Sequence, residues 1–156
     1  MVDYDKQDIF GMLFDEYKIT KPIRLIELFS GYGSQALAMK YLGANFNHYK
    51  ICEWAIPSII AYADLHRKEL VNYGKDYCGD LTKEQIANEL FNLGVSADYN
   101  KPATLDQLKR LQENKLRLVY NSIKQTNNLV DVSRVKGVDL GITNSDYDYI
   151  MTYSFP

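Results

Sequence analysis

Residues 31–36 have the sequence Gly31-Tyr32-Gly33-Ser34-Gln35-Ala36. This is the pattern G-x-G-x-x-G/A, whose small residues allow a tight turn, close approach of a ligand to the backbone, and close packing of a helix on a strand. The apolar run Ile23 to Phe29 before the glycines predicts a strand, and residues 34–42 predict a helix that ends at Gly43. This context favours a site for an adenosine-containing cofactor.

A second strand and a second helix follow the first pair. Residues 46–53 predict a strand that ends in Glu53, and residues 56–66 predict a helix in which Pro57 is tolerated because it lies in the first turn. Strand, helix, strand, helix is the order typical of a parallel sheet. Glu53 follows the glycines by about 20 residues, where a carboxylate can accept hydrogen bonds from ribose hydroxyls. These features alone do not separate a nicotinamide dinucleotide from S-adenosylmethionine.

Trp54 is the only tryptophan of the chain and directly follows Glu53. Its indole can stack on an adenine ring while the neighbouring carboxylate holds the ribose. The alternative is that Trp54 only fills the core.

Three groups of residues resemble motifs of the cytosine-5 DNA methyltransferases. The first motif resembles Glu27-Leu28-Phe29-Ser30-Gly31-Tyr32-Gly33, the second Glu53-Trp54, and the start of the fourth Ser154-Phe155-Pro156. The resemblance covers about residues 23–66 and 128–156, and the insertion between them and the first 20 residues lie outside it. It implies an α/β fold, namely a partial Rossmann-like, S-adenosylmethionine-dependent methyltransferase fold with a parallel sheet, flanking helices and a helical insertion.

The resemblance also implies the cofactor and its site. S-adenosyl-L-methionine is the expected cofactor, bound by Phe29, Ser30, Gly31, Tyr32, Gly33, Glu53, Trp54, Asp131 and Pro156. Two positions depart from the family's pattern: Ala55 stands where an acidic or polar residue is frequent, and Ser34 where a glycine is common. Neither departure blocks cofactor binding.

The aspartate of the third motif, which meets the adenine amino group in the family, has two candidates. Residues 79–82, Gly-Asp-Leu-Thr, match by letters, but Asp80 lies far before the last predicted strand and Thr82 is already explained as a helix cap. Residues 130–135 have the same character and lie one loop before that strand. We therefore prefer Asp131 to Asp80.

In the family, a cysteine thiolate attacks carbon 6 of a flipped-out cytosine, and carbon 5 then takes the methyl group from the sulfonium. The resemblance places this cysteine directly after Pro156. Cys52 and Cys78 do not occupy the nucleophile position, and Cys52 is expected to be a buried, reduced thiol. We therefore expect no catalytic residue within residues 1–156 and no methyl transfer by these residues alone.

The expected organisation is one truncated catalytic domain over residues 1–156. Residues 1–20 form an N-terminal helix, 23–66 hold the cofactor motifs, 67–127 form the helical insertion, and 128–156 hold the third motif and the strand that leads to the catalytic loop. Two capping boxes predict helix starts in the insertion, Thr82 with Gln85 and Thr104 with Gln107. Gly94 ends the first of these helices, and leucine spacing continues the second to Val119.

Composition limits the partners of the chain. A formal net charge of −2 gives no polybasic footprint, so DNA is expected to bind the intact enzyme and to bind these residues weakly or not at all. Basic side chains of the insertion could contact phosphate, but a solvated helix face is preferred for Lys109, Arg110, Lys115 and Arg117. We see no metal-ligand spacing, no signal peptide and no apolar run of the ~20 residues that span a bilayer, so we expect no metal, no membrane partner and a cytoplasmic protein.

Two other functions stay open at this level. One is a non-catalytic module that binds a cofactor or a partner, or a subunit of a split enzyme. The other, less favoured, is an NAD-dependent oxidoreductase built on the same glycine loop. The last strand, predicted over residues 147–153, would have an uncovered edge that invites self-pairing, so a homodimer through this edge is also expected.

Overall fold

The computed structural model describes residues 21–143 and 147–153. The N-terminal helix predicted for residues 1–20, the turn predicted at residues 144–146 and the segment 154–156 lie outside the described residues.

A three-stranded parallel sheet forms one side of the molecule. Its strands are β1 (Ile23–Leu28), β2 (Phe46–Cys52) and β3 (Asp148–Tyr153), in the order β2-β1-β3. The central strand β1 pairs on both sides, and its Ile23, Leu25 and Ile26 are almost fully buried, as expected for a strand between two neighbours. The predicted α/β fold with a parallel sheet is thus confirmed.

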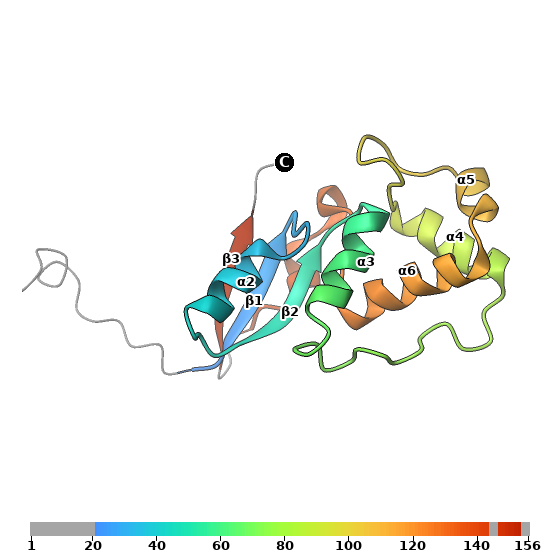
Figure 1. Ribbon diagram of the computed structural model, residues 1–156. Coiled ribbons are helices and arrows are strands. Elements are labelled where there is room, and N and C mark those ends of the chain that lie inside the picture. Colours follow the sequence, from blue (N-terminus) through green and yellow to red (C-terminus); the bar gives the residue numbers. More distant parts are fainter. Residues whose placement is uncertain (1–20, 144–146, 154–156) are drawn as a thin grey trace, which may run out of the picture.

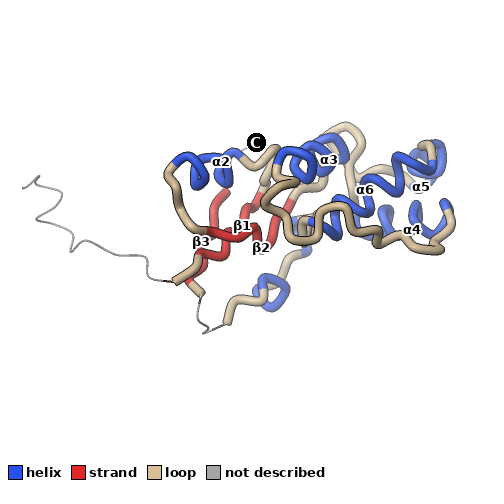
Figure 2. The backbone as a smooth tube through the Cα atoms, turned by 60° about the horizontal axis from the view of Figure 1, so that its bottom comes forward, coloured by secondary structure: helices blue, strands red, loops and turns tan. Residues whose placement is uncertain are grey.

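Helices flank the sheet (Figure 1). Helix α2 (Ser34–Tyr41) follows the glycine loop and covers one face, and α3 (Ile56–Leu65) lies between the sheet and the remaining helices. Two 3-10 turns, η1 (Val132–Arg134) and η2 (Gly137–Leu140), lie on the side of the sheet away from α2 (Figure 2). The two predicted strand–helix pairs are therefore present, with ends that differ from the predicted ones by one residue.

Residues 67–127 contain the helices α4 (Lys83–Leu93), α5 (Leu105–Arg110) and α6 (Glu113–Gln125). Both predicted capping boxes are confirmed. In the first, the Gln85 amide nitrogen donates to Thr82 Oγ1 at 3.3 Å, and the Thr82 amide nitrogen donates to Gln85 Oε1 at 2.8 Å. Gly94 ends α4 in the left-handed conformation, with φ +80°.

The prediction of one continuous second helix in the insertion was wrong. Leu111 and Gln112 have extended backbone, with ψ of 151° and 144°, and they separate α5 from α6. Helix α6 then begins anew, because the Gln112 carbonyl accepts from the amides of Lys115 and Leu116. The break lets Leu108 of α5 and Leu116 of α6 enter the same core, where both are fully buried.

A hydrophobic core cluster lies between α3 and the insertion. Its fully buried members include Ile59 of α3, Ile86 and Leu90 of α4, and Leu116 and Val119 of α6. Fully burying a side chain of this size contributes roughly 1.5–3 kcal/mol. The insertion is therefore packed on α3 as part of the same folded unit.

Arg117 has a structural contact instead of a solvated position. It pairs with Glu113 and donates to the carbonyls of Gly79 and Leu81 at 3.2 and 2.8 Å, which ties α6 to the start of α4. Lys109, Arg110 and Lys115 are exposed. Across residues 21–143 and 147–153, no helix is long and apolar enough to cross a membrane.

Candidate functional site

The two loop glycines have different surroundings. A Cβ atom at Gly33 would lie 2.2 Å from His66 Nε2 and 2.7 Å from Tyr62 Cε2, so glycine is required for close packing of the loop on α3. A Cβ at Gly31 would meet no atom within 4 Å. Both residues have positive φ, +81° and +52°. Gly33 therefore serves packing, and Gly31 leaves its backbone open to a ligand.

A cavity of about 670 Å³ lies where β1 and β2 end. This volume is within the range of small-molecule sites. Five residues predicted as cofactor-binding line it together: Phe29, Gly31, Glu53, Trp54 and Asp131. The sequence did not predict a cofactor-binding role for its other lining residues, which are Cys52, Ser58, Tyr99, Pro102, Val130, Val132 and Ser133. We call this cavity the glycine-loop pocket.

The other predicted site residues do not line the glycine-loop pocket. Ser30 is buried, and its hydroxyl has no hydrogen-bond partner among the described residues. Tyr32 is exposed, and its backbone carbonyl oxygen lies 3.1 Å from His66 Nε2. Gly33 precedes α2, and Pro156 lies outside the described residues.

Glu53 joins the end of β2 to the glycine loop. Its Oε2 accepts from the Gly31 amide at 2.9 Å, and its Oε1 accepts from the Ala55 amide at 2.7 Å. Burial raises the pKa of this carboxyl, while the hydrogen bonds from Ala55, Gly31 and Trp54 act in the opposite direction. A carboxylate has about four lone-pair sites and the three backbone amides use three of them, so Glu53 can still accept from a ligand hydroxyl.

Asn128 holds the backbone of Glu53 in place. Its Oδ1 accepts from the amides of Glu53 and Val130 at 3.0 and 2.8 Å, and its Nδ2 donates to the Glu53 carbonyl at 2.8 Å. The Leu129 amide also bonds to the Ile51 carbonyl at 2.8 Å, which aligns this segment with β2. Asn128 thereby brings Asp131, three residues further along, to the pocket that Glu53 lines.

The structure places the two third-motif candidates differently. Asp131 lines the glycine-loop pocket, whereas Asp80 is exposed before α4 and is absent from its lining. Asp131 Oδ1 accepts from the amide and hydroxyl of Ser133 at 3.0 and 2.6 Å, and its Oδ2 pairs with Arg134 Nε at 3.0 Å. This position favours Asp131, whose contact with an adenine ring stays a prediction.

Glu27 bonds to the first turn of α2, directly after the glycine loop. It is 1% exposed, and its Oε1 accepts from the Ala36 amide at 3.1 Å in the first turn of α2, where Gly33 offers no side chain as a cap. Its other oxygen accepts from the Tyr62 hydroxyl, which lies 2.7 Å from His48 Nδ1. Burial raises the pKa of Glu27 and lowers the pKa of His48 to about 4.

The two histidines of the chain lie close together in the structure. The rings of His48 and His66 lie 4.7 Å apart, and both pack on Tyr62. His48 is in β2, within the strand predicted over residues 46–53, and His66 directly follows α3, one residue after the helix ends. These two histidines, Tyr62 and Glu27 form a polar cluster between the sheet and α3, and His66 and Tyr62 lie against Gly33 of the glycine loop.

Both cysteines are free and buried. Burial, reinforced by the charges of Asp131 and Glu53, raises the pKa of the Cys52 thiol to about 11, and burial also raises the pKa of Cys78. Because the thiolate is the nucleophilic form, neither side chain is prepared for attack at neutral pH.

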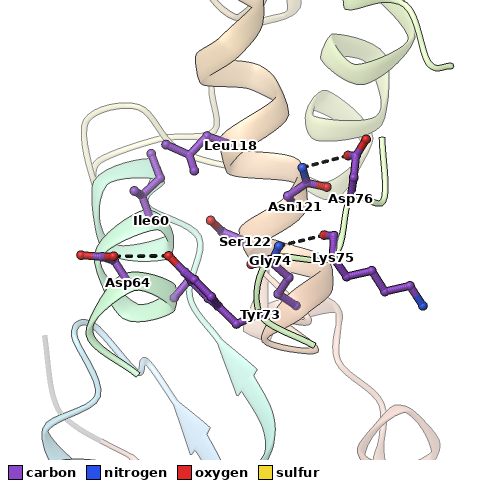
Figure 3. A pocket seen from close by; sticks show the side chains of 11 residues that line it. Ile60, Asp64, Tyr73, Gly74, Lys75, Asp76, Leu118, Asn121 and Ser122 are labelled. Carbon is purple, nitrogen blue, oxygen red and sulfur yellow. Dashed lines mark hydrogen bonds between the residues drawn. The ribbon is translucent and has the colours of Figure 1, made fainter. Parts of the chain in front are cut away.

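A second hollow, of about 370 Å³, lies between α3, α6 and the segment 73–76 (Figure 3). Its polar side chains hold that segment in place: Asn121 Nδ2 donates to Asp76 Oδ1 at 3.0 Å, and Gln125 Nε2 donates to the Lys75 carbonyl at 2.9 Å. This hollow shares no lining residue with the glycine-loop pocket. It lies where the insertion packs on α3.

The chain is similar to two methyltransferases over most of its length. It is 26% identical over 146 residues to the orphan methyltransferase M.SssI of Spiroplasma monobiae, a match that covers 88% of this chain and 34% of the relative. It is 29% identical over 136 residues to the type II methyltransferase M2.ScrFI of Lactococcus lactis subsp. cremoris, with coverage of 86% and 35%. The chain thus spans about a third of the length of these relatives. No family model matches it.

These matches confirm the predicted relationship to methyltransferases and correct its extent. The match covers 88% of the chain, and the residues outside it are too few to include the whole insertion of residues 67–127. The insertion therefore lies largely within the similarity, not outside it as predicted.

Proposed function

We propose that this chain, which is similar to methyltransferases, is the cofactor-binding part of a DNA cytosine-5 methyltransferase, and that the glycine-loop pocket binds S-adenosyl-L-methionine. One observation carries the proposal: Phe29, Gly31, Glu53, Trp54 and Asp131 were singled out from three separate motifs, and they line one cavity. Its volume and its mix of an open backbone, an indole and carboxylates fit an adenosine-containing ligand.

The residues of the pocket have separate roles in this proposal. The donor supplies an electrophilic methyl group on its sulfonium. Gly31 allows close approach to the backbone, Glu53 offers acceptors to the ribose hydroxyls, and Trp54 offers an aromatic face to the purine. The chain's contribution is to hold the donor in a fixed position, which is catalysis by proximity.

DNA is the proposed substrate of the intact enzyme, and residues 1–156 alone are proposed to bind the donor without transferring its methyl group. The support is that Cys52 and Cys78 are buried thiols with raised pKa values. Residues 1–156 are also proposed to bind DNA weakly or not at all. The support is their net charge of −2 and the engagement of Arg117 with the backbone carbonyl of Leu81. Methyl transfer to DNA by residues 1–156 alone would contradict this part of the proposal.

The site assignment is tested by the emission of Trp54, the only tryptophan, during titration with S-adenosylmethionine. We expect a saturable change, and a loss of affinity of roughly tenfold to a hundredfold in Asp131→Asn, because a hydrogen bond to a charged group contributes about 1.5–3 kcal/mol. Asp80→Asn is the matched control and should bind as the wild type does. Weakened binding in Asp80→Asn alone would move the third motif to residues 79–82.

A further inference from the structure

The loop between α4 and α5, residues 96–103, is fixed to the backbone next to Trp54. The Ser96 amide donates to the Trp54 carbonyl at 2.7 Å, and the Ile56 amide donates to the Ser96 carbonyl at 2.8 Å. Pro102 pairs with Ser96 in an antiparallel bridge, and the Ala103 amide donates to the Val95 carbonyl at 2.8 Å. This part of the insertion is therefore held beside the glycine-loop pocket.

The loop also holds its own shape. Ser96 is fully buried, and its hydroxyl donates to the Lys101 carbonyl at 2.7 Å. The Asn100 amide donates to Asp98 Oδ1 at 3.1 Å. Between these residues, Tyr99 has a φ of +67°, a conformation that residues other than glycine adopt only when their surroundings impose it.

Tyr99 connects the insertion to α3 and to the glycine loop. Tyr99 lines the cavity while 50% of the residue stays exposed, which places it on the outer wall. Its hydroxyl lies 3.1 Å from Oγ of Ser58, a buried residue of α3 that lines the same cavity. A side-chain hydrogen bond with Tyr99 also raises the pKa of Tyr32 in the glycine loop.

We propose that Tyr99 is a ligand-contacting residue that closes the outer side of the glycine-loop pocket over the adenosine part of the bound methyl donor, with Ser58 fixing its hydroxyl. This inference rests on the proposed function. The half-exposed ring has surface left to bury against a ligand, and it lies on a loop bonded to Trp54, the residue proposed to face the purine. An aromatic contact of this kind is expected to change affinity by up to about tenfold.

The test compares Tyr99→Gly, Tyr99→Phe and the wild type. Glycine accepts a φ of +67°, so Tyr99→Gly removes the ring and keeps the loop conformation. Tyr99→Phe removes only the hydroxyl that meets Ser58. The control is Tyr41→Ala, because Tyr41 is 89% exposed and does not line the pocket. Alanine is used here and not glycine because Tyr41 lies in helix α2.

Binding of S-adenosylhomocysteine is measured by calorimetry, and the melting temperature is measured in parallel. We expect affinity about tenfold weaker in Tyr99→Gly, a smaller loss in Tyr99→Phe, no loss in Tyr41→Ala, and a melting temperature of Tyr99→Gly at or above that of the wild type. Wild-type affinity in Tyr99→Gly would overturn the role of Tyr99 while leaving the proposed function intact. Absence of saturable binding to the wild type would overturn the proposed function and this inference with it.

Discussion

Gly33 and Gly31 are two residues apart and carry different physical constraints. At Gly33 the space that a side chain needs is occupied by the rings of His66 and Tyr62, which come from α3. At Gly31 the space is open and faces the glycine-loop pocket. A substitution at the first position therefore acts on packing, and one at the second acts on ligand access.

Alanine substitutions separate these two effects. We expect Gly33→Ala to lower the free energy of unfolding by roughly 1–3 kcal/mol through overpacking, in addition to its unfavourable φ. Gly31→Ala carries the φ cost alone, but its methyl group reduces the affinity for S-adenosylmethionine. Urea unfolding and ligand titration of both variants measure this. Equal losses of stability in the two variants would contradict the assigned roles.

Some residues of the site could be predicted from the sequence, and others could not. Glu53 and Trp54 were found from their distance to the glycines and their resemblance to a motif, and they do line the pocket. Asn128 and Tyr99 were not found, because their contacts with Glu53 and Ser58 join residues 75 and 41 positions apart. Such contacts depend on how α4, α5 and α6 pack, and no local pattern encodes that.

Among the elements, α4 begins where the sequence predicts and α6 does not. The capping box of Thr82 and Gln85 is a contact between residues three positions apart, so it is visible in the sequence. The break at Leu111 and Gln112 follows from fitting Leu108 and Leu116 into one core, which leucine spacing alone does not reveal.

The cap of α4 gives a prediction about the coupling of the insertion to the sheet. We expect Thr82→Ala to destabilise the protein by about 1 kcal/mol and Thr82→Ser to have a much smaller effect, because serine keeps the hydroxyl. Since α4 and α6 share a core with α3, Trp54 emission and far-ultraviolet circular dichroism should report the same unfolding transition. Two separate transitions would mean that the insertion unfolds independently.

On the scale of the whole molecule, the sheet has one side of β3 without a strand partner among the described residues. Such an edge favours pairing with a second copy. We therefore expect residues 1–156 to self-associate, with a mass by light scattering above that of the 18.0 kDa chain. Met151→Lys, at a position 46% exposed on β3, should shift the population to monomer. A wild type that stays monomeric at high concentration would contradict this expectation.

The whole molecule also shows why the insertion belongs to the site. Its core fixes α3, and its loop 96–103 is bonded to the backbone at Trp54 and Ile56, so the pocket is built by both parts of the chain. The similarity to the two methyltransferases extends over the insertion in the same way. The motifs alone indicated a smaller site than the structure contains.

We propose above that the glycine-loop pocket holds a methyl donor and not a nicotinamide dinucleotide. Calorimetric titration of residues 1–156 with S-adenosylmethionine, S-adenosylhomocysteine and NAD tests it most directly. We expect saturable binding of the first two ligands at one site per chain, weakened by Trp54→Ala, and no measurable binding of NAD. Preferential binding of NAD, or binding of S-adenosylmethionine that Trp54→Ala and Glu53→Ala leave unchanged, would contradict it.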